Sequence, residues 1–266
     1  MVEVTGLVNK RTMSPALAIP RKRGLPAHPG PDFPHFGLGK RMLYIRRDLA
    51  ARATAIFAAL AQLHHIASSG AGNRGSGFPL KLDGGPDLFA RCGMRGGFVR
   101  FINSDIYFGA GARPLRELAI ANEARLRGVP IAEPLGVLIE TVAPGSYRSA
   151  FITRALNGMT LWEFLRADDD AVVRAHVVEL ARRAIDTMHD AGVLHADLNL
   201  HNLFVSNAGE RMTAVILDLD KAQVFNGAVP SARRRANFSR LKRSANKLDS
   251  DRRYLDAKSL AILTAS

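Results

Sequence analysis

Short apolar runs and longer amphipathic segments follow one another along the chain, and each type of spacing predicts a different element. Runs of five to eight residues bounded by glycine, proline or aspartate predict strands. They cover 39–45, 78–82, 88–92, 135–142, 149–154 and 211–217. The turn Asp83-Gly-Gly-Pro-Asp87 separates the second run from the third and predicts a hairpin.

Apolar residues spaced three or four positions apart predict helices over 47–68, 114–126, 171–191 and 231–248. Gly128 and Pro130 end the second segment, and Gly192 ends the third. Thr160 followed three residues later by Glu163 is a capping box, which predicts another helix start.

This order of elements predicts an α+β protein with a small sheet-rich lobe (35–156) before a mainly helical lobe (157–266). Residues 1–34 contain six prolines and scattered basic residues, which predicts a flexible segment. The lobe boundary is expected near 154–158. A ligand-binding cleft is expected between the lobes, because ligand sites prefer domain junctions.

Composition narrows the class of protein. Of 266 residues, 47% are apolar, as in folded soluble proteins. The single cysteine, Cys92, excludes an intrachain disulfide and fits a reducing compartment. The N-terminus lacks the pattern of a secretion signal. The most apolar stretch, 49–66, contains Arg52 and two histidines, so it fits an alanine-rich helix better than a membrane span.

The formal net charge of +13 favours an acidic partner, which could be nucleic acid, an anionic membrane surface or a phosphorylated substrate. Much of the excess lies in 10–23 and in 233–253, and the second run has nine basic and two acidic residues. Few aromatic residues accompany this run, which favours a membrane surface or anionic headgroup over nucleic acid. A merely solvated helix face is the alternative.

The chemical signal is strongest between Val193 and Asp220. Asp197 and Asn202 lie five residues apart in the loop His195-Ala-Asp-Leu-Asn-Leu-His-Asn-Leu203, and Asp218 follows a later apolar run. Phosphoryl transfer needs a carboxylate to orient and deprotonate a hydroxyl, and amide and carboxylate oxygens to hold Mg²⁺. Loop Asp and Asn residues usually form turns, but the joint spacing is typical of kinase-like phosphotransferases.

Around these motifs the chain resembles the bacterial lipopolysaccharide kinases, the Kdo and heptose kinase family, and within it the Kdo kinases most. The resemblance covers about 39–248. It rests on the 195–203 loop, on Arg95-Gly-Gly97, on Glu117 and on the basic segment Asn237–Ser244. It implies a two-lobed protein-kinase-like fold and transfer of the γ-phosphoryl of ATP to a hydroxyl, the 4-OH of Kdo, on a lipid A precursor. The expected location is peripheral, on the cytoplasmic face of the bacterial inner membrane.

The residues then take specific roles. Asp197 is the expected catalytic base, and Asn202 and Asp218 are expected to hold Mg²⁺ against the phosphates of ATP. Arg91 is expected to bind phosphate and to be positioned by Glu117. Arg95 is a second candidate for this phosphate contact.

The glycine-rich loop, including Gly75 and Gly77, is expected to cradle phosphates or to be a flexible connector. Residues 152–156 are expected to lie beneath adenine.

Smaller features leave alternatives open. Asn199 occupies the place of a lysine in many protein kinases, which argues against a protein substrate, and Asp220 replaces a usual glycine. His195 is expected to be structural, whereas His201 could reach the acceptor. A heptose kinase, a protein or antibiotic kinase, and a pseudokinase that binds anionic lipid or RNA are the rival functions.

Overall fold

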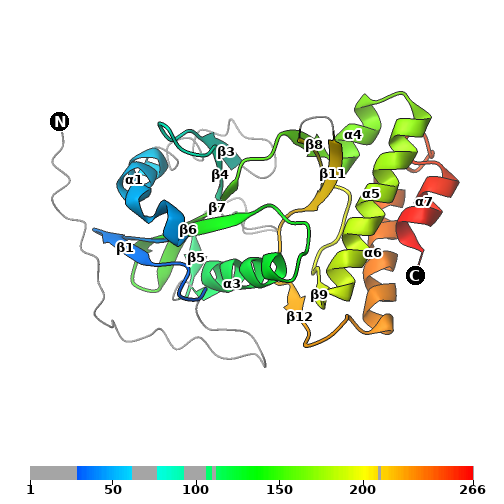
Figure 1. The fold of residues 1–266 in the computed structure, drawn as a ribbon. Coiled ribbons are helices and arrows are strands. Elements are labelled where there is room, and N and C mark those ends of the chain that lie inside the picture. The colour runs from blue at the N-terminus through cyan, green and yellow to red at the C-terminus, as the bar shows by residue number, and fades with distance from the viewer. Residues whose placement is uncertain (1–28, 62–76, 93–105, 110–111, 209–210, 266) are drawn as a thin grey trace. The chain divides into compact units, whose positions relative to one another are not determined.

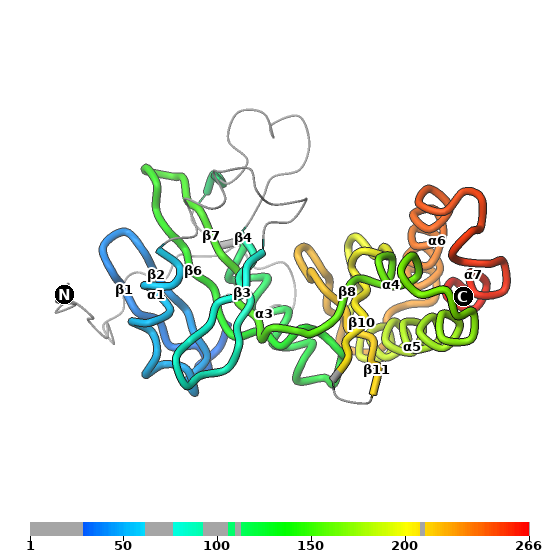
Figure 2. The backbone as a smooth tube through the Cα atoms, turned by 90° about the horizontal axis from the view of Figure 1, so that it is seen from above, coloured from blue at the N-terminus to red at the C-terminus, as the bar shows by residue number. Residues whose placement is uncertain are grey.

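The computed structural model describes residues 29–61, 77–92, 106–109, 112–208 and 211–265 (Figure 1). Contacts divide the chain into two compact units, one within 1–119 and 133–155, the other formed by 120–132 and 156–266. Figure 2 follows the chain through both. The sequence had placed 120–132 with the sheet. They group with the second unit because Ile131 bridges Ile216, and Arg127 donates to the carbonyls of Ala191 and Phe225.

The first unit is built on an antiparallel sheet with strand order β1-β2-β6-β7-β4-β3, and β5 also pairs with β7. The strands are β1 (His35–Leu38), β2 (Arg41–Ile45), β3 (Gly77–Leu80), β4 (Leu88–Cys92), β5 (Tyr107–Phe108), β6 (Pro134–Ala143) and β7 (Ser146–Arg154). The predicted β3–β4 hairpin is confirmed. The strand predicted over 39–45 is wrong at its start, because Gly39 has φ of 58° and turns the chain between β1 and β2.

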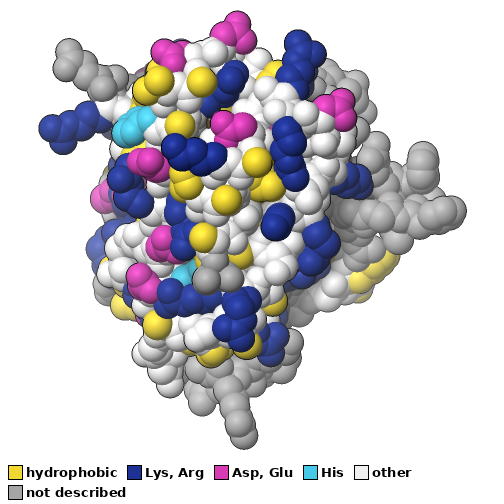
Figure 3. Space-filling model, turned by 90° about the vertical axis from the view of Figure 1, so that its right-hand side faces the viewer, with side chains coloured by type: hydrophobic (Ala, Val, Ile, Leu, Met, Phe, Trp, Pro, Cys, Tyr) yellow, Lys and Arg dark blue, Asp and Glu magenta, His cyan; other side chains and the backbone are white. Residues whose placement is uncertain are grey.

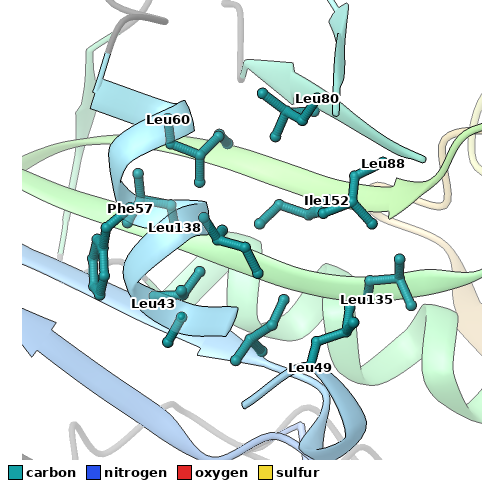
Figure 4. Close-up of a cluster of buried hydrophobic side chains, with 14 of the residues drawn as sticks. Leu43, Leu49, Phe57, Leu60, Leu80, Leu88, Leu135, Leu138 and Ile152 are labelled. Carbon is teal, nitrogen blue, oxygen red and sulfur yellow. The ribbon is translucent and has the colours of Figure 1, made fainter. Parts of the chain in front are cut away.

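One face of this sheet packs against α1 (Ala53–Ala61), which follows a 3₁₀ turn over Arg47–Arg52. Leucines of the sheet and of α1 meet in one buried cluster (Figure 4). Leu43 and Leu138 are register partners on that face, so the period of two along each strand sets the core. The segment predicted as a helix over 47–68 begins as a 3₁₀ helix and continues as α1, and its end lies outside the described residues.

The other face of the sheet packs against α3 (Ala112–Leu126). Leu115 and Leu118 of this helix pack with Val137, whose side chain alternates with that of Leu138. Phe33 joins the same cluster and is only 1% exposed. The end of the segment expected to be flexible is thus anchored in the core, since burying a phenylalanine stabilises the fold by about 1.5–3 kcal/mol.

Among its described residues, the second unit combines a three-stranded sheet with four whole helices and the end of α3. The sheet has the order β11 (Arg211–Ile216), β10 (Leu203–Ala208), β8 (Gly158–Thr160), and β9 (Val193–Leu194) pairs with β12 (Gln223–Val224). The helices are α4 (Leu161–Ala167), α5 (Ala171–Asp190), α6 (Ser231–Leu248) and α7 (Ala257–Thr264). The capping box at Thr160 and the bounds of α6 are confirmed, whereas α7 was not predicted.

Helix α5 ends where the sequence predicts. Gly192 follows it with φ of 79°, and a Cβ there would lie 2.3 Å from the carbonyl oxygen of Gly227. Glycine is therefore required both by the backbone conformation and by the close approach. Within the part of the chain that is described, no helix has the length and apolarity to span a membrane.

Candidate active site

The loop between β9 and β10 alternates buried leucines with accessible polar residues. Leu198, Leu200 and Leu203 are each 0% exposed and hold the loop to the second unit. The carboxylate-bearing side chain of Asp197 is 74% exposed, and Asn202 is partly exposed. The loop thus presents its polar groups to solvent on a rigid apolar base.

Asn199 organises this loop through both ends of its amide. Its Nδ2 donates to the backbone oxygen of Asp197 at 2.9 Å and more weakly to Asp197 Oδ2 at 3.4 Å. Its Oδ1 accepts from the backbone N–H groups of His201 and Asn202. The residue in the place of a kinase lysine therefore shapes the loop and orients the Asp197 carboxylate. The general turn preference of asparagine is the signal for this role that can be found in the sequence.

His195 ties the loop to the end of β11. Its Nδ1 accepts from the backbone N–H of Asp197 at 2.9 Å, so its Nε2 is the protonated nitrogen and donates to the Leu217 oxygen at 2.9 Å. Burial lowers the pKa of His195, which keeps the ring neutral. The structural role predicted for this histidine is confirmed.

Leu217 is held on both sides, which places Asp218 beside the loop. Its N–H donates to the Asn202 oxygen at 2.9 Å, while its oxygen accepts from His195. Asp218 follows in the left-handed region with φ of 58°, a conformation that aspartate tolerates better than most residues. Its Oδ1 accepts from the N–H of Asp220 at 3.3 Å, so Asp220 takes part in the turn.

Asn202 and Asp218 carry amide and carboxylate oxygens, the kinds of ligand that magnesium prefers. Asn202 Nδ2 donates to the Asp197 backbone oxygen at 2.8 Å, and Asn202 Oδ1 takes no part in that hydrogen bond. Asp218 is exposed at the end of β11. Among the described residues, no three His, Cys, Asp or Glu side chains gather into a cation site. Kinase sites commonly hold Mg²⁺ through one or two protein oxygens together with phosphates and water, and this pair supplies such oxygens.

A buried chain of hydrogen bonds connects α6 to the loop. Asn237, 5% exposed, donates from Nδ2 to the His195 backbone oxygen at 2.9 Å. Its Oδ1 accepts from Nε2 of His189 at 3.0 Å, at the end of α5. Burial lowers the pKa of His189. The sequence had marked Asn237 only as part of the basic segment of the family resemblance, and its role depends on residues about 40 positions away.

Arg240, one turn after Asn237, lies beside the expected base. Its Nη1 is 3.8 Å from Asp197 Oδ1, and both side chains are at least half exposed. At this distance and exposure the contact is a loose ion pair, worth at most about 1 kcal/mol. No local pattern in the sequence singles out this arginine from the other cations of α6.

In the first unit, the structure joins Arg91 on β4 to Glu117 on α3. Arg91 Nη2 and Glu117 Oε1 form the expected ion pair. The guanidinium also lies over the ring of Phe151, 5.9 Å from its centroid. The ion pair is as expected, and contact of Arg91 with phosphate stays a prediction.

Other nucleotide-binding predictions have less structural support. Gly77 begins β3, where a Cβ would meet the ring of Phe89 at 2.2 Å, so close packing already accounts for this glycine. Gly75 and Arg95 lie outside the described residues. Residues 152–154 are the end of β7, and contact of 152–156 with adenine stays a prediction.

Comparison with known proteins gives a consistent result. Residues 91–261 match the lipopolysaccharide kinase (Kdo/WaaP) family. A 3-deoxy-D-manno-octulosonic acid kinase of Actinobacillus succinogenes is 31% identical over 156 residues, which cover 56% of this chain and 62% of that protein. The kinase of the same name from Xylella fastidiosa strain M23 is 30% identical over 187 residues, covering 68% and 70%.

Among solved structures, one titled "WaaP in complex with acyl carrier protein" aligns with a TM-score of 0.46 and 19% identity. The alignment covers 71% of this chain and 74% of that one.

Proposed function

Because the chain belongs to the lipopolysaccharide kinase (Kdo/WaaP) family, we propose that it is an ATP- and Mg²⁺-dependent kinase of Kdo on a lipid A precursor, with the 4-OH as acceptor. The two units would be the lobes of a protein-kinase-like fold. The observation that carries the proposal is the hydrogen-bonded assembly around His195, which holds the Asp197–Asn202 loop against the strand end that bears Asp218.

In the proposed reaction, the acceptor oxygen forms a bond to the γ-phosphorus as the bond from that phosphorus to the β–γ bridging oxygen breaks and ADP leaves. Asp197 orients the hydroxyl and takes its proton. Asn199 holds the Asp197 carboxylate through its 3.4 Å contact, and the His195 ring fixes the Asp197 backbone. Because the transition state is loose, orientation of the hydroxyl is the larger part of this task.

The phosphates need positive charge. Asn202 and Asp218 would hold Mg²⁺, which neutralises the charge that develops on the phosphates when ATP is bound. Arg91, fixed by Glu117, would bind phosphate oxygens through its planar guanidinium. Both assignments rest on residue chemistry and position.

We also propose that the protein binds the cytoplasmic face of the inner membrane peripherally. Helix α6 has seven basic and no acidic residues. Figure 3 shows many Lys and Arg side chains and fewer Asp and Glu side chains on one face of the molecule. Each cation near an anionic leaflet contributes about 1 kcal/mol, so a few are enough for reversible binding.

The deciding experiment follows γ-labelled phosphate from ATP into a Kdo-bearing lipid A precursor in neutral detergent. We expect label in the lipid, and a loss of about 100-fold or more in Asp197→Asn, which keeps the shape but removes the basic carboxylate. A heptose-bearing acceptor is run in parallel. Label only in the heptose acceptor would move the assignment to a heptose kinase. Nucleotide binding without transfer to either acceptor would refute the proposal that the protein is a sugar kinase.

A further inference from the structure

Arg240 is placed beside Asp197 by the helix that carries it. Helix α6 is fixed to the 195–203 loop by the buried Asn237–His195 hydrogen bond, one turn before Arg240. The spacing of three residues puts Asn237 and Arg240 on neighbouring positions of the helix surface. The helix backbone at Arg240 therefore has a defined position relative to the loop, and Nη1 of Arg240 lies 3.8 Å from Asp197 Oδ1.

The cations of α6 differ in their surroundings. Arg234 is occupied elsewhere, because it pairs with Asp190 at 2.7 Å and donates to the Val229 oxygen. Arg240 makes only a loose contact, and its side chain is 50% exposed. It can exchange Asp197 for another anion at little cost, since an exposed ion pair of this kind contributes at most about 1 kcal/mol.

An acceptor bound for transfer must place its hydroxyl within hydrogen-bonding distance of Asp197. The guanidinium of Arg240 is then within reach of groups a few bonds away from that hydroxyl. Guanidinium binds planar carboxylates through two parallel hydrogen bonds, whereas a neutral sugar offers it no charged partner. A carboxylate on the acceptor therefore complements the site better than a further hydroxyl does.

We propose that Arg240 is a specificity-determining residue that binds the carboxylate of a sugar-acid acceptor and so presents a hydroxyl a few bonds away from that carboxylate to Asp197. This inference rests on the proposed function. On acceptor binding, Arg240 turns from Asp197 to the carboxylate of the sugar, and an oxygen of Asp197 becomes available for the hydroxyl. The enzyme would thereby distinguish an acidic sugar from a neutral one at the site of transfer.

Steady-state kinetics on the full chain tests this, with the Kdo-bearing acceptor in neutral detergent and saturating ATP. We expect Arg240→Gln to raise the KM for the acceptor by roughly 10- to 100-fold, the usual effect of losing a charge-assisted hydrogen bond. The KM for ATP should stay unchanged. Arg240→Lys keeps the charge but not the planar fork, so its KM should be intermediate. Arg183→Gln on α5 is the matched control, because Arg183 is also exposed and lies outside the site.

The second arm uses an acceptor whose carboxyl group has been reduced to an alcohol. For the wild-type enzyme, the KM for this acceptor should be raised by the same factor as in Arg240→Gln with the unreduced acceptor. Combining Arg240→Gln with the reduced acceptor should raise the KM no further, because the two changes remove one interaction. If Arg240→Gln raised the KM relative to the wild type by the same factor on both acceptors, the proposal would be overturned. A phosphate or the membrane would then be the partner of Arg240. An unchanged KM in Arg240→Gln would also overturn the proposal. Absence of transfer by the wild type would refute the proposed function itself.

Discussion

The buried link between α6 and the catalytic loop predicts that Asn237→Ala is strongly destabilising. The substitution leaves the His195 oxygen and the Nε2–H of His189 without their partner. A buried polar group left unsatisfied costs about 1–3 kcal/mol, so two cost about 2–6 kcal/mol. Alanine regains up to about 0.7 kcal/mol as the better helix former. The expected net loss is about 1.3–5.3 kcal/mol.

The chain carries its own probe for this measurement. Trp162 is the single tryptophan, it is 9% exposed, and it lies on α4 in the same unit as Asn237. Urea unfolding followed by its fluorescence gives the stability of that unit. Ser239→Ala, at an exposed position of the same helix, should stay within about 0.5 kcal/mol of the wild type.

The kcat of Asn237→Ala should also be lower than that of the wild type, because the backbone of His195 and Asp197 is no longer fixed from α6. A stability loss in Asn237→Ala no larger than that in Ser239→Ala would refute the reasoning, since the hydrogen-bonded chain would then contribute nothing.

Three further changes test separate parts of the molecule. Thr160→Ala removes the capping box of α4 and should cost about 1 kcal/mol in the Trp162 unfolding assay, and no change would mean that the cap is dispensable. His189 has a lowered pKa through burial, opposed by Asn237 and by nearby carboxylates. Below its unfolded value of 6.5 the unfolded chain binds more protons than the folded one, so stability should fall as the pH drops from 6.5 towards the folded pKa and be fully present above 6.5. His189→Gln keeps a donor for Asn237 and should flatten this slope, and an unaltered slope would assign it to other groups. Glu117→Gln removes the charged partner of Arg91 and should weaken ATP binding several-fold by calorimetry, roughly in line with the loss of one ion pair; equal affinity would argue against a phosphate contact by Arg91.

Local patterns were enough to predict most elements of the fold. The β3–β4 hairpin, the capping box at Thr160 and the bounds of α6 depend on turn residues, a capping pair and apolar periodicity within a few positions. At Gly39 a local turn lies within an expected strand. At Phe33 contacts override local preference, because its side chain packs with α3 although its neighbours are rich in proline.

The candidate site divides in the same way. The sequence by itself determined the order and spacing of Asp197, Asn202 and Asp218, because the chemistry of the loop is encoded in adjacent residues. Only the tertiary structure decided how Asp218 is held to the loop, through His195 and Leu217, and which cation of α6 lies beside Asp197. Those contacts join residues 15 to 43 positions apart. They depend on how helices and strands pack, which no local pattern of polar and apolar residues specifies.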